Sequence, residues 1–150
     1  MIITEERPSR VWHEIMPLLQ EHWKEIAHYP DIPLEPDYAV YKNMEDLDCI
    51  RLYCARIDGK LVGYSVFFLR YNPHYKSSLQ ASQDIIYVDP AYRGGVGRHL
   101  IKECDERLKK EGVQVVYQHV KAKHNFGSML ERMGYELQDL IYSKRLDKEN

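Results

Sequence analysis

The sequence predicts a single α/β domain whose mixed sheet is mostly antiparallel. Two apolar, β-branched runs at residues 50–57 and 61–71 flank Asp58-Gly59, a strong signal for a hairpin of antiparallel strands. A third run at residues 85–88 precedes a glycine cluster, a helical pattern and a fourth run at residues 113–120. A strand–helix–strand unit of this length is a right-handed parallel crossover. The sheet should therefore contain one parallel pair beside its antiparallel strands.

The length and composition of the chain limit the classes of function that it can have. The chain has 150 residues, of which 44% are hydrophobic, so residues 1–150 can form one globular domain that buries about two-thirds of its unfolded surface. The net charge of −2 offers no general attraction to nucleic acid or to an anionic membrane, and we expect neither as a partner. The three cysteines lack paired close spacing, and no Cys/His cluster has zinc spacing. We expect a reduced, cytoplasmic protein without a metal site.

The N-terminal third should contain a strand and two helical segments. Residues 1–5 predict a first strand, and an apolar stripe from residue 11 to residue 26 predicts a helix capped by Ser9. Proline costs about 3 kcal/mol inside a helix, so Pro17 predicts a kink or a division into two short helices. The proline-rich residues 29–37 should be irregular and lead into a short helix from residue 36 to about residue 47.

The remaining elements follow in order. A polar interval at residues 72–78 turns the chain toward the strand at residues 85–88. The helix after the glycine cluster starts near Val96 and ends at Gly112, and the strand at residues 113–120 follows. A short helix at residues 126–132 should end at Gly134. Residues 135–146 then predict one long strand or two broken ones, and residues 147–150 a solvated tail.

The stretch at residues 84–101 has the residue types of an anion site. Asp89-Pro90 ends the strand, and the glycines that follow let the backbone turn sharply and approach a ligand. The helix behind them leaves its first N–H groups unpaired at the positive end of its dipole, which suits phosphate. Arg93 and Arg98 add positive charge. Neither the dinucleotide fingerprint nor the Walker loop is matched, since Arg98-His99 follows Gly97.

The segment from Val88 to Gly97 resembles the coenzyme A (CoA) pyrophosphate loop of the GNAT (Gcn5-related) N-acetyltransferases, though one residue shorter. Asn125 with residues 130–135 resembles the second segment of that family, and the element order matches over nearly the full chain. The resemblance implies a three-layer fold around a central sheet, with the parallel crossover at the CoA site, and acetyl-CoA as cofactor. It also implies three sets of contacts: Ile86, Tyr87 and Val88 for the pantetheine arm, Asn125 for that arm or its thiol, and Arg93, Gly94, Gly95, Val96, Gly97 and Arg98 for the pyrophosphate.

The chemistry requires a base, because a primary amine with a pKa of about 10.4 is protonated at neutral pH. Asp84 is our candidate, since the resembling spermidine/spermine acetyltransferases carry a glutamate there; the alternative is that it bonds at a strand end or orients a cationic substrate. The tyrosine that often serves the family as general acid is replaced by Leu130. Tyr135, Tyr142 or water must then protonate the leaving thiolate.

The acceptor neighbourhood carries no motif. By the resemblance it lies near residues 29–47, where Tyr29, Tyr38 and Tyr41 are candidates for substrate binding or for simple core packing. The leading hypothesis is an acetyl-CoA-dependent N-acetyltransferase acting by direct attack on a primary amine of a small molecule or protein. The alternative is a non-catalytic acyl-CoA-binding or protein-interaction module on the same fold. A homodimer stays open as a further partner.

Overall fold

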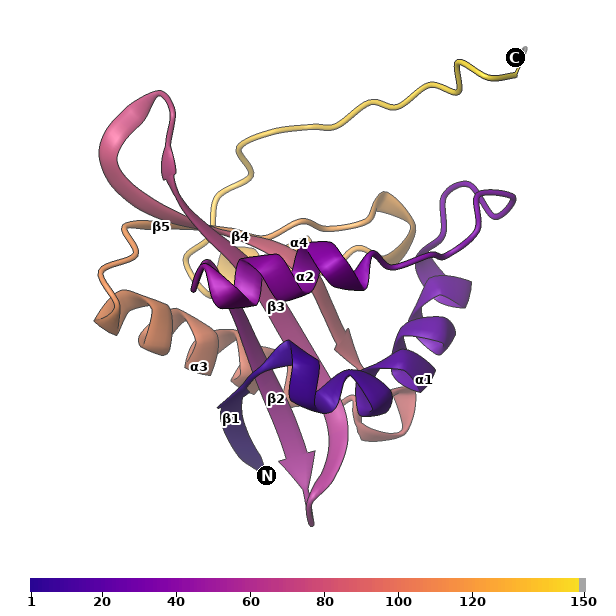
Figure 1. Cartoon of the computed structure of the whole chain (residues 1–150), viewed down its shortest axis with the longest axis horizontal. Coiled ribbons are helices and arrows are strands. Elements are labelled where there is room, and N and C mark those ends of the chain that lie inside the picture. The colour runs from indigo at the N-terminus through magenta and orange to yellow at the C-terminus, as the bar shows by residue number, and fades with distance from the viewer. Residues whose placement is uncertain (149–150) are drawn as a thin grey trace.

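The structure, a computed structural model, describes residues 1–148 and places a twisted five-stranded sheet between two layers of helices (Figure 1). Helices α1 and α2 cover one face of the sheet, and α3 covers the other. The elements are β1 (Ile2–Glu6), α1 (Pro8–Ile26), α2 (Tyr38–Asp46), β2 (Ile50–Ile57), β3 (Lys60–Asn72), β4 (Tyr75–Val88), the 3-10 turn η1 (Pro90–Tyr92), α3 (Val96–Lys110), β5 (Val115–Tyr117), the 3-10 turn η2 (Ala122–His124) and α4 (Gly127–Arg132).

The sheet confirms the predicted fold class. Its strand order is β1-β2-β3-β4-β5, and the first three pairings are antiparallel. The β4–β5 pair is parallel and is connected through α3, as the strand–helix–strand pattern predicted. The hairpin of β2 and β3 turns at Asp58-Gly59, where both residues have positive φ.

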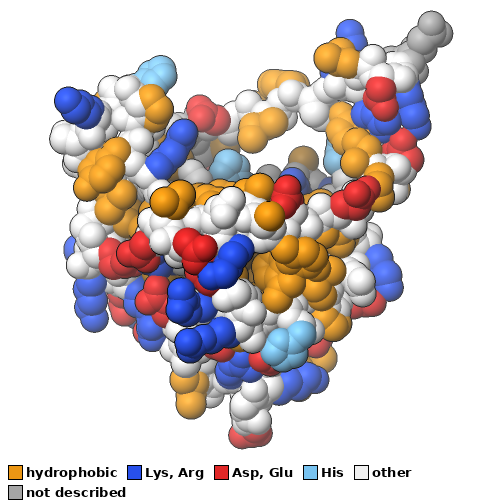
Figure 2. Space-filling model, viewed as in Figure 1, with side chains coloured by type: hydrophobic (Ala, Val, Ile, Leu, Met, Phe, Trp, Pro, Cys, Tyr) orange, Lys and Arg blue, Asp and Glu red, His pale blue; other side chains and the backbone are white. Residues whose placement is uncertain are grey.

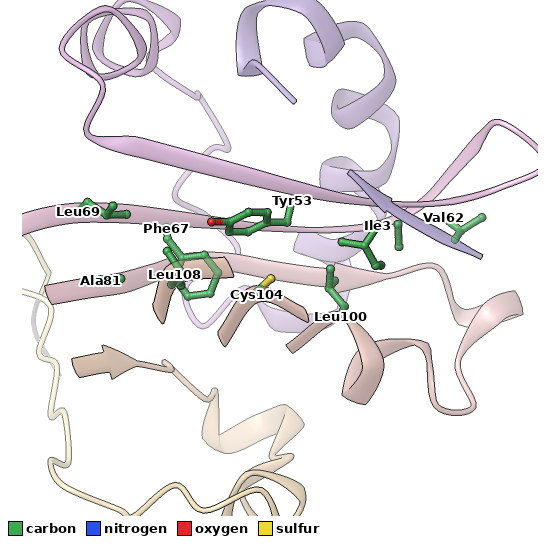
Figure 3. Close-up of a cluster of buried hydrophobic side chains, with 10 residues drawn as sticks. Ile3, Tyr53, Val62, Phe67, Leu69, Ala81, Leu100, Cys104 and Leu108 are labelled. Carbon is green, nitrogen blue, oxygen red and sulfur yellow. The ribbon is translucent and has the colours of Figure 1, made fainter. Parts of the chain in front are cut away.

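Two cores lie on opposite faces of the sheet, because successive strand residues point to opposite sides. Along β2, Tyr53 and Ala55 face α3, while Leu52 and Cys54 face α1. Figure 3 shows the α3-side cluster, in which side chains of the sheet meet the buried stripe of that helix: Leu100, Cys104 and Leu108. The alternation fixes the register of the sheet, since a one-residue slip would exchange the two cores.

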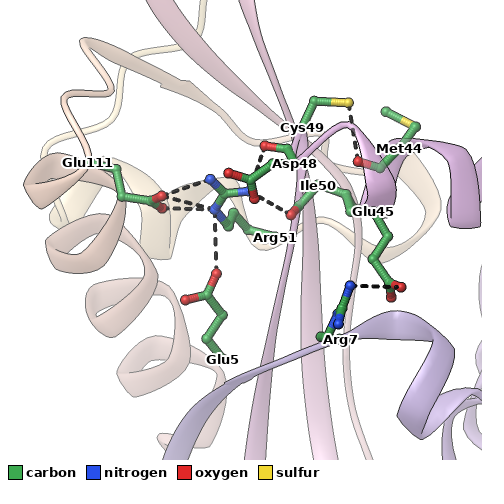
Figure 4. A network of polar contacts seen from close by, with 9 residues as sticks. All are labelled: Glu5, Arg7, Met44, Glu45, Asp48, Cys49, Ile50, Arg51 and Glu111. Carbon is green, nitrogen blue, oxygen red and sulfur yellow. Dashed lines mark hydrogen bonds and ion pairs between the residues drawn. The ribbon is translucent and has the colours of Figure 1, made fainter.

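An ion-pair network around the buried Arg51 joins the edge of the sheet to the end of α3 (Figure 4). Arg51 is only 8% exposed and contacts Glu111 at 2.8 Å, Asp48 at 3.1 Å and Glu5 at 3.4 Å. A guanidinium can serve several carboxylates at once because its five N–H donors point outward in a plane. The network therefore ties β1, β2 and α3 together.

The first helix departs from the prediction in two respects. It runs unbroken over 19 residues although Pro17 lies inside it. Pro17 and His13, whose carbonyl loses its helical partner, are both exposed, so water can satisfy that carbonyl. Ser9 is not the cap: Arg7 is the N-cap residue and Pro8 the first helical residue. Ser9 instead donates from its backbone N–H and its hydroxyl to the buried Glu45 of α2.

The second half of the chain differs from the prediction in strand lengths. The polar interval forms a tight second hairpin, so β4 begins at Tyr75 and is 14 residues long. By contrast, β5 has only three residues. The prediction of a strand or strands at residues 135–146 is wrong for this structure, since apolar residues need a hydrogen-bonded neighbour to form a strand and the segment lies beside none. Gly134 ends the preceding helical turn with φ 95°, as expected.

Within residues 1–148, no helix combines the length and apolar character that crossing a membrane requires. The cysteines are unpaired, and Cys54 and Cys104 are buried.

Candidate active site

The edge of β4 opens at the point where β5 leaves it. The two strands pair only across Gln80–Ser82 of β4, whereas β4 continues to Val88. Over residues 83–88, β3 is therefore the one strand that pairs with β4 in the described part of the chain. An exposed strand edge can accept an extended ligand through main-chain hydrogen bonds. This is the stretch for which the pantetheine contacts were predicted.

The glycine loop lies directly beyond this open edge. Asp89 accepts a hydrogen bond from the Ala91 backbone N–H at 3.0 Å, which closes the turn η1. Gly94 and Gly95 have φ values of 140° and 101°, a conformation that other residues rarely adopt. Gly95 is the N-cap of α3 and contributes no side chain, and the first turn of the helix holds no acidic residue. The first helical amides thus have no side-chain cap, as an anion site would require.

The two arginines of the loop differ in their surroundings. The guanidinium of Arg93 binds both carboxylate oxygens of Glu25 at 2.9 Å, and its Nε donates to the Val88 carbonyl at 2.9 Å. It also lies over the Tyr87 ring. Arg98 is exposed, and no ion pair of Arg98 occurs among residues 1–148. Arg98 is therefore the more available cation, while Arg93 joins the loop to α1.

A buried histidine lies beneath Arg93. His22 of α1 is 7% exposed and stacks on the Tyr87 ring with 4.7 Å between centroids. Burial lowers the pKa of His22 to about 4, so the imidazole is neutral near pH 7. Its Nδ1 has no hydrogen-bond partner among the residues that the structure describes. The sequence offered no signal for this contact, because His22 falls within an ordinary helical stripe.

Asp84 owes its position to a β-bulge. Val66 pairs with Ile85 while Phe67 pairs with Gln83, so Asp84 is an extra residue in β4. Its carboxylate accepts a hydrogen bond of 2.6 Å from the Tyr41 hydroxyl of α2. The bulge thus directs an acidic side chain toward the helical layer at the start of the open strand edge.

The surroundings of Asp84 raise its pKa. Burial is the largest cause, and it is opposed by the Tyr41 hydrogen bond and by the charge of His119. The residue still has an exposed surface because it lies at an open pocket, while crowded protein atoms displace much of the surrounding water. A carboxylate with a raised pKa is a better proton acceptor than an ordinary aspartate.

The pocket beside Asp84, here called the α1–α2 pocket, has a volume of about 300 Å³. Its walls come from α1, the proline-rich residues 33–37, α2 and the middle of the sheet. Figure 2 shows apolar side chains gathered where α1 and α2 meet. Among the lining residues are four aromatic side chains, Trp12, Trp23, Tyr41 and Tyr64, and three carboxylates, Glu35, Asp37 and Asp84.

Of the three predicted acceptor tyrosines, only Tyr41 lines this pocket. Tyr38 contacts the Trp12 ring edge-on at 4.7 Å and borders a neighbouring hollow of about 250 Å³. Tyr29 lies elsewhere, where its hydroxyl bonds with Ser143 at 2.7 Å and its ring underlies Arg145. The sequence prediction missed the two tryptophans and Tyr64, which resemble core residues when the chain is considered alone.

Two further predicted residues are engaged away from Asp84. The Tyr135 hydroxyl donates to Asp105 of α3 at 2.6 Å, and burial together with that bond raises the pKa of Tyr135. The Asn125 side chain accepts from the Gly127 backbone N–H at 2.7 Å at the start of α4. Neither lines the α1–α2 pocket. Across residues 1–148, no group of three or more His, Cys, Asp or Glu side chains is arranged to hold a metal ion.

Comparison with protein families agrees with this geometry. The model of the acetyltransferase (GNAT) family matches residues 12–135. The chain belongs to the GNAT family. The match begins within α1 and ends after α4, so it includes the glycine loop, the bulge and the pocket. No curated protein sequence matches the chain significantly.

Solved structures share the GNAT fold at low identity. A ribosomal-protein-alanine N-acetyltransferase from Brucella melitensis biovar Abortus 2308 is 22% identical, with a TM-score of 0.72 over 97% of this chain and 100% of that one. An aminoglycoside acetyltransferase from an uncultured soil metagenomic sample, in complex with sisomicin, is 14% identical, with a TM-score of 0.75 over 97% and 96%. A predicted acetyltransferase from Clostridium acetobutylicum with acetyl-CoA is 10% identical, with a TM-score of 0.73 over 97% and 96%.

Proposed function

We propose that this GNAT protein transfers an acetyl group from acetyl-CoA to a primary amine by direct attack. The observation that carries the proposal is the bulge in β4, which places Asp84 between the open strand edge and the α1–α2 pocket. An acyl donor on the edge and an amine in the pocket would meet beside this carboxylate.

The residues of the loop fit CoA. The amides at the start of α3, the glycines at positive φ and the exposed Arg98 would hold the pyrophosphate. The unpaired edge at Ile86, Tyr87 and Val88 would hold the pantetheine arm. The Clostridium acetobutylicum neighbour was solved with acetyl-CoA, which supports this cofactor. Acetyl-CoA supplies an acyl group activated as a thioester.

Asp84 performs the proton step in this mechanism. A bound ammonium loses one proton to the carboxylate, directly or through a water in the pocket, and the amine lone pair becomes available for attack. Tyr41 holds the carboxylate in place and stays protonated, because burial and the neighbouring charge raise the pKa of its hydroxyl. The amine nitrogen forms a bond to the acyl carbon and the carbon–sulfur bond breaks. The second proton that the nitrogen loses would pass through a water to the departing sulfur.

Water is the donor we assign to the departing thiolate. Leu130 is buried at 5% exposure and has no acidic group, and the Tyr135 hydroxyl is held by Asp105. Tyr142 is 89% exposed on the C-terminal segment. A covalent enzyme intermediate is disfavoured, because burial raises the pKa of the Cys54 and Cys104 thiols, and Cys49 donates to the Met44 carbonyl and does not line the pocket. Unpaired cysteines also fit the cytoplasm, which we propose as the location.

Leu130 favours one competing function, a module that binds acyl-CoA without turnover. The test combines two measurements on the full chain. CoA should raise the melting temperature, as a ligand selective for the folded state must. Acetyl-CoA with a panel of amines, amino acids and peptides should release free thiol. A CoA-dependent shift without thiol release on the whole panel would establish the module, and the absence of both signals would refute either function.

A further inference from the structure

The charges that line the α1–α2 pocket are of one sign. The lining includes the carboxylates of Glu35, Asp37 and Asp84, and no Lys, Arg or His occurs among its residues. One carboxylate oxygen of Asp37 accepts a hydrogen bond from the Val40 backbone N–H as the cap of α2. Within residues 1–148, Glu35 forms no ion pair. A pocket of this charge attracts a cation and repels a second carboxylate.

The rest of the lining is apolar. Besides the aromatic rings, it comprises aliphatic side chains of α1, β3 and β4, Leu34, and the prolines at positions 33 and 36. Its volume of about 300 Å³ lies at the lower end of the range for small-molecule sites. A ligand with an apolar body binds such walls favourably, because apolar surface is buried. A ligand with many hydroxyl groups would find few hydrogen-bond partners there. The aromatic faces can also contact an ammonium group.

We propose, resting on the proposed function, that the acceptor is a small primary amine with an apolar body and without a carboxylate. An arylalkylamine has this chemistry. The corresponding α-amino acid has the same reacting nitrogen and a similar body, but it would bring its own carboxylate toward Glu35, Asp37 and Asp84. The pocket therefore discriminates between an amine and its amino acid by charge.

The test compares phenethylamine, phenylalanine and phenylalanine amide. Their binding to the full chain saturated with CoA is measured by calorimetry, because CoA has no acetyl group and permits no turnover. Phenethylamine should bind at least about tenfold more tightly than phenylalanine. Phenylalanine amide, whose carboxamide carries no charge, should recover most of the difference. Glu35→Gln should reduce the difference in affinity between the amine and the amino acid. Glu131→Gln, an exposed change on α4, is the matched control and should leave that difference intact.

The inference would be overturned if phenethylamine and phenylalanine bound equally tightly. It would also be overturned if Glu35→Gln left the ratio of their dissociation constants unchanged. Tighter binding of phenylalanine amide and of a Phe-Ala dipeptide than of phenethylamine would also overturn it, in favour of a protein N-terminus. These results are independent of the proposed function, which fails only if CoA gives no melting shift or no amine releases thiol from acetyl-CoA.

Discussion

The glycine loop and the α1–α2 pocket are the two halves of the proposed site, and they are built in different ways. The loop occupies one stretch, residues 88–98, and in the proposed function it would bind mainly through its backbone. The pocket draws side chains from Trp12 to Ile85 and depends on how α1, α2 and a bulged strand pack together. Asp84 stands between them. A binding function can thus be local in the sequence while the chemistry it serves is not.

The largest expected effect is that of Asp84→Asn, which should impair the chemistry in the pocket and leave binding at the loop intact. If Asp84 is the base, kcat at neutral pH should fall by about a hundredfold or more, because the proton has lost its acceptor. The deficit should shrink as rising pH deprotonates the amine in solution. In the wild type the rate should fall as the pH drops through the raised pKa of Asp84, since only the ionised form accepts a proton.

Steady-state kinetics over pH 6 to 9 check this prediction, and CoA binding should be unchanged because the loop is intact. Asp46→Asn, an exposed change on α2, is the control. A role in orienting a cationic substrate would instead raise the acceptor KM with little loss at saturation. Wild-type kinetics in Asp84→Asn would remove Asp84 from both roles.

The second prediction concerns a variant that should impair CoA binding at the glycine loop and leave the α1–α2 pocket unchanged. Gly95→Asp should raise the CoA dissociation constant by at least about tenfold, because it places a negative charge at the anion site and a side chain at φ 101°. Gly112→Asp is a matched control: Gly112 has φ 90°, and a Cβ at either glycine meets nothing within 4 Å. Gly112 lies beyond the opposite end of α3, so this variant should keep the CoA-induced melting shift. Equal losses in both variants would mean that strain, not charge, is responsible.

The sequence predicted the local features of the fold and the site well. The Asp58-Gly59 hairpin, the glycine loop and the helix end at Gly112 are each determined by neighbouring residues, and the structure confirms these elements. The loop's role in CoA binding stays a prediction. Asp84 was selected because it lies four residues before Val88, where the resembling spermidine/spermine acetyltransferases carry a glutamate, and this choice required no knowledge of packing.

The features that sequence reasoning missed depend on distant contacts. Trp12 and Trp23 follow the helical stripe of a core residue, and only the placement of residues 33–37 turns their surface into a pocket wall. Ser9 looked like a cap because its real partner, Glu45, is 36 residues away. The segment at residues 135–146 has the composition of a strand, but composition cannot supply the neighbour to which a strand must bond.

The third prediction compares the two arginines of the loop, Arg98 and Arg93. Arg98→Ala should raise the CoA dissociation constant several-fold, about 1 kcal/mol, with little change in melting temperature, because Arg98 is exposed. Arg93→Ala should mainly lower the melting temperature, because it frees Glu25 and the Val88 carbonyl. Calorimetry and thermal unfolding of both variants separate the roles. The opposite assignment, with affinity lost in Arg93→Ala alone, would make Glu25 a contact that CoA displaces.

The smallest predicted effect lies in the pocket, at the hydrogen bond between Tyr41 and Asp84. Tyr41→Phe removes a bond that lowers the pKa of Asp84 and leaves burial, which raises it. The ring can still pack on Trp12 and Phe68. The pKa of Asp84 should therefore rise, and the acid limb of the rate profile should move to higher pH. A net hydrogen bond is worth about 1 kcal/mol, so kcat should fall up to about fivefold on the acid limb of the profile and recover on the plateau at higher pH.

The profile of Tyr41→Phe is best compared with that of Tyr75→Phe, which removes an exposed hydroxyl at the turn into β4. That control should leave the acid limb in place. If Tyr41→Phe loses the same fraction of its rate at every pH, then Tyr41 positions the substrate and does not act on the pKa of Asp84. A shift of the limb to lower pH would contradict the proton-acceptor role itself, because the bond that Tyr41 donates favours the ionised carboxylate.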